Sequence, residues 1–378
     1  MIKIGFITGA RSEYGIMKPV IRSIAKDSRF DVSIIATGMH YLNQYGHTID
    51  EIYNDGLAIV IDAPCYREKC TSKKDDFVAL INVLYNVLFG KTYDVVYLIG
   101  DRLEAYASAL VAHFLKIPIV HYAGGQITEG AVDNIYRYNI SNLATIHLVT
   151  NIFAEERLAQ SPIVDSSNVF IVGSSAIDAI NEYLKKPQDA SIIDTHLRRG
   201  NYVLMTFHSE TNSNQSCCSI SEMMDVAIED IVSNNEYVLI TYPNNDDGVD
   251  KILSIIHKWE NNPYVIVRKN LGALKYYIAV DNAKYVIGNS SSAIIEVPYF
   301  QKYSVDVGSR QQGRNHPMSV IHINNDSTEL KRTLNQLRKD DRCLCAQEYI
   351  YGKGNSLSLI PDIVKKTVPP PITAFKTR

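Results

Sequence analysis

The sequence predicts two α/β domains in tandem, each built on a doubly wound parallel sheet that helices cover on both faces. Three observations support this prediction. The chain has 378 residues, which is enough for two domains with separate cores. Apolar runs of strand length alternate along the chain with segments of helical period. A polar stretch with a proline, residues 184–189, interrupts this alternation once, and the alternation then begins again.

The strands of the first domain are nearly continuous apolar runs, as expected when both faces of a parallel sheet are buried. The runs lie at residues 2–8, 32–37, 58–61, 94–99, 117–122, 146–150 and 169–172. Segments of helical period lie between them, for example residues 16–26, 75–88 and 103–115. Residues 1–184 form the predicted N-terminal domain.

The same pattern follows the polar stretch. Strand-like runs lie at residues 202–206, 237–241, 264–267, 285–287 and 304–307. We therefore predict a C-terminal domain over residues 190–355, with a cleft between the two domains. Residues 356–378 are expected to form a last helix and a tail, because the prolines at 369–371 cannot continue a helix.

Composition and charge argue against several classes of protein. The 38 basic and 41 acidic side chains nearly cancel, which disfavours a nucleic-acid-binding surface. No apolar stretch reaches the roughly 20 residues of a membrane helix, and the first apolar run is too short for a signal peptide. The six cysteines form no CxxC pair, so we expect free thiols and a cytoplasmic location. The ten histidines are scattered, so no metal site is predicted.

Polar side chains gather where the predicted strands end. In open parallel sheets, ligands bind beyond the carboxyl ends of the strands. If the two sheet edges face each other, they form one active site between the domains. The strand-end segments are residues 8–15, 100–104 and 121–126 in the first domain, and 207–210, 242–246, 288–292 and 308–310 in the second.

One of these segments suits a phosphate group. The small-residue turn at 288–292 leads into a helix predicted over residues 293–299, and such a turn exposes backbone N–H groups to an anion. Arg310 and His208 would complete a diphosphate clamp. The alternative is that Ser290 only caps the helix. The chain has neither a GxGxxG nor a P-loop motif, which disfavours a dinucleotide-binding fold and a P-loop kinase.

Acidic residues follow two strands of the first domain. Asp101 and Glu104 come after one strand, and Glu129 and Asp133 follow the next. Carboxylates at the edge of a cleft can act as general acids or bases. The alternative is that they only interact favourably with helix N-termini. For Asp101 we prefer the catalytic interpretation.

Together these motifs resemble those of the hydrolysing UDP-N-acetylglucosamine 2-epimerases of the sialic-acid type. Each motif is short, but their order and spacing are specific, and they extend from Ile4 to about His322. The motifs are Thr8-Gly9-Ala10-Arg11-Ser12-Glu13-Tyr14-Gly15, Thr37-Gly38-Met39-His40, Gly100-Asp101-Arg102-Leu103-Glu104, Gly173-Ser174, Phe207-His208, Tyr242-Pro243-Asn244-Asn245-Asp246, Gly288-Asn289-Ser290-Ser291 and Gly308-Ser309-Arg310-Gln311.

The resemblance implies two Rossmann-like domains in the glycosyltransferase-B arrangement, a homodimer, and no metal or nicotinamide cofactor. Family enzymes remove the C2 proton, expel UDP to leave a 2-acetamidoglucal, and add water with inversion at C2. By matching motif positions, Asp101 and Asp133 would be catalytic carboxylates, and we count His208 among the catalytic residues. The nucleotide would be held by Arg11, Arg102, His208, Asn244, Ser290, Ser291, Glu296 and Arg310.

One segment departs from the family pattern. The family usually has an acid, a second acid, a histidine and a lysine at the positions of Gln126, Asn134, Tyr138 and Asn142. An amide such as Gln126 cannot exchange a proton at neutral pH, and losing one acid/base group typically costs about 10²–10⁴-fold in rate. Glu129 is the nearest carboxylate that could substitute for it.

Three functions fit these observations. The leading prediction is a hydrolysing nucleotide-sugar 2-epimerase that serves nonulosonic acid synthesis, such as that of sialic or legionaminic acid. Its donor would be UDP-N-acetylglucosamine or UDP-2,4-diacetamido-2,4,6-trideoxyglucose, with GDP as an alternative nucleotide. The second function is a glycosyltransferase or a nucleotide-sugar hydrolase without epimerisation, because neither needs a C2 base. The third is nucleotide-sugar binding without catalysis.

Overall fold

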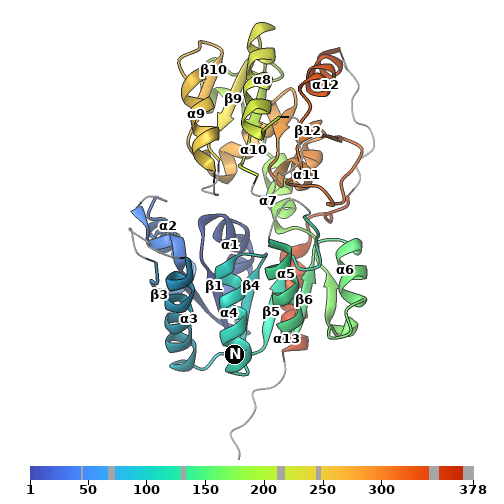
Figure 1. The fold of residues 1–378 in the computed structure, drawn as a ribbon. Coiled ribbons are helices and arrows are strands. Elements are labelled where there is room, and N and C mark those ends of the chain that lie inside the picture. The colour runs from blue at the N-terminus through green and yellow to red at the C-terminus, as the bar shows by residue number, and fades with distance from the viewer. Residues whose placement is uncertain are drawn as a thin grey trace, which may run out of the picture. The chain divides into compact units, whose positions relative to one another are not determined.

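The computed structural model of the chain describes residues 1–43, 46–66, 73–128, 133–210, 218–243, 248–339 and 349–368. The chain divides into two compact units, which we describe separately (Figure 1). Unit 1 comprises Met1–Gln126, Val132–Asp178 and Tyr351–Arg378, and unit 2 comprises Ile127–Ala131 and Ala179–Ile350. The domain boundaries that we expect from the sequence stay predictions.

Unit 1 is built on a sheet that has seven strands within the described residues, in the order β3-β2-β1-β4-β5-β6-β7. All neighbouring strands are parallel. The strand order reverses between β1 and β4, and ligands of such sheets bind beyond the carboxyl ends at this point. The strands are β1 (Ile2–Thr8), β2 (Phe30–Thr37), β3 (Ile59–Ala63), β4 (Val95–Ile99), β5 (Ile119–Tyr122), β6 (Ile146–Val149) and β7 (Val169–Ile171).

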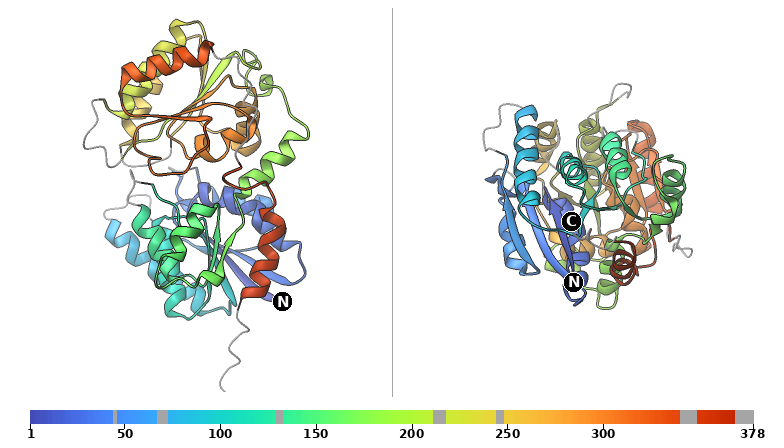
Figure 2. Two further views of the ribbon diagram at one scale, coloured as in Figure 1. Left: turned by 90° about the vertical axis from the view of Figure 1, so that its right-hand side faces the viewer. Right: turned by 90° about the horizontal axis from the view of Figure 1, so that it is seen from below.

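Helices cover both faces of this sheet, because successive side chains of a strand point to opposite faces. Ile4 and Phe6 of β1 join one core with residues of α1 and α13, and Ile7 joins a second core with residues of α3 and α4. The helix α13 lies beside α1 although the two belong to opposite ends of the chain (Figure 2). The helices are α1 (Arg11–Ala25), α2 (Ile49–Asp55), α3 (Lys73–Phe89), α4 (Leu103–Phe114), α5 (Asp133–Leu143), α6 (Ile152–Ala159), α7 (Ser175–Leu184, which continues into unit 2) and α13 (Ser356–Thr367), with 3-10 helices η1 (Gly38–Tyr41) and η3 (Ser166–Asn168).

Unit 2 has a second parallel sheet, with six strands within the described residues in the order β10-β9-β8-β11-β12-β13. Its main core packs inward-facing residues of the strands against α8, α9 and α12. The strands are β8 (Tyr202–Thr206), β9 (Tyr237–Thr241), β10 (Val265–Arg268), β11 (Val286–Gly288), β12 (Ser304–Val307) and β13 (Val320–Ile323). The helices are α8 (Ile220–Ser233), α9 (Val249–Trp259), α10 (Gly272–Asn282), α11 (Ser292–Ile295) and α12 (Ser327–Lys339), with 3-10 helices η4 (Ala190–Ile192) and η5 (Val297–Phe300).

The predicted fold class is confirmed, and each predicted strand is present with its ends shifted by two residues at most. Among the described residues, no helix is long and apolar enough to cross a membrane. The predicted start of the first helix at residue 16 is wrong, because α1 already begins at Arg11. The strand β13 was not predicted, since His322 interrupts its short apolar run.

The predicted helix over residues 293–299 is also wrong. The α-helix α11 ends at Ile295, and the 3-10 helix η5 follows it with Pro298 in its first turn. Proline lacks a backbone N–H and clashes with the preceding turn, so it breaks an α-helix at this point. The predicted C-terminal helix corresponds to α13, and the proline-rich tail at 369–378 lies outside the described residues.

Candidate active site

The loop after β4 carries Asp101 and is fixed from below by a buried histidine. Gly100 adopts a left-handed backbone conformation with φ of 71°, which turns the chain sharply at the end of the strand. His121 Nε2 donates to the carbonyl of Gly100 at 2.8 Å, so its Nδ1 accepts from the Ser141 hydroxyl at 2.9 Å. Burial lowers the pKa of His121 to about 3. His121 is therefore neutral and supports the loop that carries Asp101.

Asp101 forms an ion pair with Arg137, which projects from α5. The side chain of Arg137 is 2% exposed and that of Asp101 is 24% exposed, so the carboxylate reaches solvent while its counter-ion does not. Arg137 Nη1 also donates to the carbonyl of Gln126 at 2.8 Å and to Asn134 Oδ1 at 2.7 Å. The buried guanidinium of Arg137 thus contacts Asp101, Gln126 and Asn134. The last two are positions at which the chain departs from the family pattern.

Gln126 is buried, and its side-chain amide donates to the Thr150 hydroxyl. It therefore occupies the position of the usual acid as a hydrogen-bonded, uncharged group. Asp133 is the first residue of α5. Glu129, the proposed substitute acid, lies outside the described residues.

Two further carboxyl groups are buried at the ends of β1 and β4. Glu13 Oε2 accepts from the backbone N–H groups of Gly9 at 2.7 Å and Ala10 at 3.2 Å, while Oε1 has no hydrogen-bond partner among the described residues. Burial raises the pKa of Glu13 to about 8, with the charge of Glu104 as a further cause. Sequence reasoning missed this role of Glu13, although its position three residues after Ala10 is that of a capping-box acid.

The predicted nucleotide-binding arginines of unit 1 have different surroundings. Arg102 Nε pairs with the buried carboxylate of Glu104 at 3.3 Å, and Glu104 also accepts from Tyr66 Oη at 3.1 Å. Arg102 therefore has an anchored guanidinium next to Asp101 in the chain. Arg11 is exposed at the start of α1 and pairs with Glu51 at 3.4 Å.

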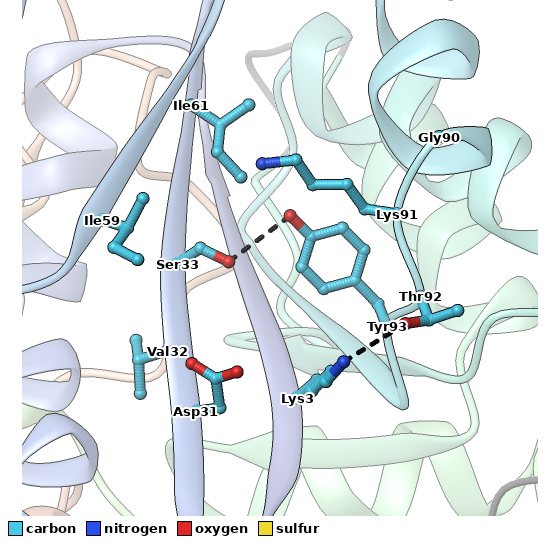
Figure 3. Close-up of a pocket in the computed structure, with 10 residues that line it drawn as sticks. All are labelled: Lys3, Asp31, Val32, Ser33, Ile59, Ile61, Gly90, Lys91, Thr92 and Tyr93. Atoms are coloured by element: carbon cyan, nitrogen blue, oxygen red, sulfur yellow. Dashed lines mark hydrogen bonds between the residues drawn. The ribbon is translucent and has the colours of Figure 1, made fainter.

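A pocket in unit 1 lies apart from these loops (Figure 3). Its lining includes Lys3 and Asp31, at the starts of β1 and β2, and Tyr93, whose hydroxyl bonds to Ser33 Oγ at 3.4 Å. Among the described residues that line it, none is a predicted site residue. Because ligands of parallel sheets bind at the carboxyl ends of the strands, this pocket is not a candidate active site.

In unit 2, the loop after β8 places His208. The side chain of Asn289, which is fully buried, accepts from the His208 backbone N–H at 2.7 Å and donates to its carbonyl at 2.9 Å. Burial, with the nearby charge of Arg310, lowers the pKa of His208 to about 3. His208 is therefore neutral at pH 7 and can offer a diphosphate an N–H donor but no positive charge.

The loop after β12 carries Arg310 and is held by Glu210, which sequence reasoning did not select. Glu210 Oε1 accepts from the backbone N–H of Ser309 at 2.6 Å and of Arg310 at 3.1 Å, and Oε2 accepts from Asn325 Nδ2 at 3.2 Å. Gly308 has φ of 87°, and a Cβ added there would lie 2.4 Å from Glu210 Oε1. Only a glycine at 308 leaves room for this contact.

The serine turn differs from the predicted anion site. The helix α11 has only four residues, so it contributes little helix dipole. Ser291 is its N-cap residue and makes no side-chain capping bond within the described residues, while the Ser290 hydroxyl accepts from the Ser292 backbone N–H at 3.5 Å. Burial raises the pKa of Glu296, at the end of α11, to about 7. Asn244 lies outside the described residues.

Among the described residues, no three His, Cys, Asp or Glu side chains are grouped as a metal-ion site requires. Two parallel α/β units with polar strand ends define the class of two-domain Rossmann-like proteins of the glycosyltransferase-B type. A solved structure of this class, UDP-GlcNAc 2-epimerase from Neisseria meningitidis bound to UDP-GlcNAc, matches with a TM-score of 0.82 at 18% identity, covering 97% of this chain and all of the other.

The family model of UDP-N-acetylglucosamine 2-epimerase matches residues 22–365. The chain is 31% identical to UDP-N,N'-diacetylbacillosamine 2-epimerase (hydrolyzing) of Legionella pneumophila, over 85% of both chains. It is 28% identical to GDP/UDP-N,N'-diacetylbacillosamine 2-epimerase (hydrolyzing) of Campylobacter jejuni, over 84% of this chain and 83% of the other. The chain belongs to the UDP-N-acetylglucosamine 2-epimerase family, as its motifs predicted.

Proposed function

We propose that the chain is a hydrolysing nucleotide-sugar 2-epimerase. It would convert UDP-N-acetylglucosamine, or UDP-2,4-diacetamido-2,4,6-trideoxyglucose, to UDP and the free manno-configured sugar. The similarity to two relatives whose names state hydrolysis carries this proposal. The same relatives favour the diacetamido sugar as the donor, and with it a role in nonulosonic acid synthesis.

The site residues support a reaction in two stages. A carboxylate takes the C2 proton while the C1–O bond to UDP breaks, which leaves a 2-acetamidoglucal. Water then adds, with its oxygen at C1 and a proton at C2 on the opposite face. Asp101 and Asp133 are the proposed acid/base carboxylates, and a preorganised group near the diphosphate would stabilise the departing charge.

The geometry gives Asp101 a specific advantage for this chemistry. Its pairing with a buried arginine holds a positive charge beside the carboxylate, and its partial exposure leaves it accessible to a substrate. Arg102, Arg310 and His208 are the proposed contacts of the diphosphate. Because His208 is neutral, the positive charge there comes from the arginines.

Gln126 sharpens the proposal. A buried amide hydrogen-bonded to Thr150 can orient a sugar hydroxyl or acetamido group but cannot carry the second proton. We therefore infer that this proton is carried by Asp133 or Glu129. The alternative function that tolerates Gln126 is glycosyl transfer or nucleotide-sugar hydrolysis without epimerisation, because neither reaction needs a second acid.

The remaining parts of the proposal concern the assembly and the location of the protein. We infer from the family resemblance that the chain acts as a homodimer in the cytoplasm, with no metal or nicotinamide cofactor. Sedimentation equilibrium measures the assembly directly, and a monomer at micromolar concentration contradicts it.

The deciding experiment is NMR of the protein with each UDP-sugar in D₂O. Release of UDP with a manno-configured sugar deuterated at C2 is the expected result, and the faster donor identifies the substrate. UDP release with hydrogen retained at C2 refutes the elimination step and favours hydrolysis or transfer. Tight binding of either intact donor without turnover refutes the enzymatic proposal altogether.

A further inference from the structure

Glu210 connects three strand-end loops of unit 2. It follows β8 by four residues, and its carboxylate accepts hydrogen bonds from two consecutive backbone N–H groups after β12, those of Ser309 and Arg310. The Ser309 hydroxyl adds a bond at 3.3 Å, and Asn325, after β13, adds one at 3.2 Å. One side chain thus satisfies donors from loops that are about 100 residues away in sequence.

Two consecutive N–H groups that point to one place form a small anion-binding site. Here the anion is part of the protein, because Glu210 Oε1 occupies that place at 2.6 Å and 3.1 Å from the two nitrogens. The backbone of Gly308 lies so close that an added Cβ would be 2.4 Å from the same oxygen. The turn therefore holds an internal carboxylate, which already occupies the two N–H groups that could bind an external anion.

His208 lies two residues before Glu210, in the loop after β8. Its backbone is clamped by the buried amide of Asn289, and the Gln311 amide donates to the carbonyl of Asn289 at 3.0 Å. Two sets of hydrogen bonds therefore connect the loop after β8 with the loop after β12. One set runs through Glu210, and the other runs through Asn289 and Gln311. The charge of Arg310 is a second cause, after burial, of the lowered pKa of His208.

We propose that Glu210 is a positioning residue, which fixes the loop of Arg310 against the loop of His208 so that both groups meet one nucleoside diphosphate. This inference rests on the proposed function, since it assumes that these two residues bind the nucleotide. It adds a residue that contacts no substrate and acts through hydrogen bonds to the loop of Arg310.

Three substitutions separate geometry from charge. Glu210→Gln keeps an oxygen that can accept from Ser309 and Arg310. Rotation of the Asn325 amide satisfies the new NH₂ group, because Asn325 Oδ1 has no partner in the part of the chain that the structure describes. Glu210→Asp keeps the charge but is shorter by one methylene and cannot reach all the donors. Glu210→Ala removes the acceptor and leaves buried N–H groups unsatisfied.

The matched control is Asp225→Ala. Asp225 also lies in unit 2 and also accepts hydrogen bonds from more than one residue, Lys258 Nζ at 2.8 Å and Trp259 Nε1 at 2.6 Å, but it lies on α8, away from the strand-end loops. A loss of stability alone therefore affects Asp225→Ala and Glu210→Ala alike. A change in nucleotide affinity is expected only for the Glu210 variants.

The experiment is isothermal titration of the full chain and each variant with UDP, and with GDP as the second probe. We expect Glu210→Gln to bind within about threefold of the wild type, and Glu210→Asp and Glu210→Ala about tenfold or more weakly. Asp225→Ala should bind like the wild type. All measurements are made well below the melting temperature of each variant.

Unchanged affinity in both Glu210→Asp and Glu210→Ala overturns the inference and leaves the proposed function standing. Tighter binding by Glu210→Gln and Glu210→Ala also overturns it, because it shows that Glu210 acts only as a charge that repels the phosphates. A wild-type chain without affinity for UDP or GDP overturns the proposed function and this inference together.

Discussion

Replacing Glu13 by glutamine should stabilise the protein at alkaline pH, although it removes a charged group that makes two hydrogen bonds. Glu13 is buried at the start of α1, and one of its carboxylate oxygens has no partner within the described ranges of the chain. The charged form is therefore poorly solvated, which is why burial raises its pKa to about 8. Glutamine is neutral and nearly isosteric, and its oxygen can still accept from Gly9 and Ala10.

The sign and the size follow from the two pKa values. In the unfolded chain Glu13 loses its proton near pH 4.5, while in the folded chain it keeps the proton until about pH 8. The folded state thus binds more protons between these values, so its stability falls as the pH rises through this range. At about 1.4 kcal/mol per unit, with relaxation of the neighbours, we expect a loss of about 2–4 kcal/mol that the variant avoids.

The assay is urea unfolding at pH 5 and pH 8, followed by circular dichroism. Fluorescence of Trp259, the single tryptophan of the chain, reports separately on unit 2. The difference between the unfolding free energies of wild type and Glu13→Gln should be small at pH 5, just above the unfolded pKa, and should grow by about the stated amount at pH 8. Parallel pH dependence of the two proteins refutes the reasoning.

A second capping-box glutamate provides the matched control. Glu222 accepts from the Ser219 backbone N–H at 2.6 Å at the start of α8, but it is exposed. Hydrogen bonds from the backbone and the side chain of Ser219 lower the pKa of Glu222. Its contribution to stability is therefore present above its ordinary pKa and lost in acid, so Glu222→Gln should weaken the protein at pH 8. The two glutamates thus have effects of opposite sign.

Three further predictions concern the two sets of strand-end loops. Arg137→Met should lower the unfolding free energy by about 2–4 kcal/mol and turnover by at least about 100-fold, because it leaves the Asp101 carboxylate without its buried partner. Urea unfolding measures the first effect and the NMR assay measures the second. Turnover equal to that of the wild type contradicts the role of this pair. His208 should show no titration between pH 5 and 8 in ¹H NMR, assigned by loss of its signal in His208→Gln, and a midpoint near 6.5 contradicts its burial as the cause. Gly38→Ala should lower the free energy of unfolding by about 1–3 kcal/mol, because φ is 58° and the new Cβ would lie 2.9 Å from a backbone oxygen. Gly15→Ala on α1 meets open space and should raise the free energy of unfolding by about 0.5–1 kcal/mol. Thermal melts that show equal effects of the two variants contradict the steric argument.

The positions of most strands along the chain were predictable because the sheets are parallel and buried on both faces. Such strands are continuous apolar runs, and the runs at residues 202–206 and 304–307 match β8 and β12 at both ends. The start of α1 was not predictable from periodicity, because its first turn is polar. It is instead specified by the contact of Glu13 with Gly9 and Ala10.

The positions of the site residues were predictable only in part. Their place at strand ends follows from the fold, since the carboxyl ends of parallel strands share one edge. Their partners do not follow, because Arg137 and Asp101 are 36 residues apart and Glu210 and Ser309 are 99 apart. Local sequence patterns contain no information on contacts over such separations, and this is why Glu210 was missed.

The return of the C-terminal segment to unit 1 has a consequence for how the protein folds during its synthesis. During synthesis the ribosome delivers β1 to β7 first, then the strands β8 to β13 of unit 2, and only afterwards the helix α13. Ile360 and Val364 of that helix are fully buried in the core of unit 1, and Ser23 Oγ donates to the Leu357 carbonyl at 2.8 Å. The nascent first sheet must therefore wait with an apolar surface uncovered until α13 has been synthesised. The unit whose residues appear first is the last to finish folding.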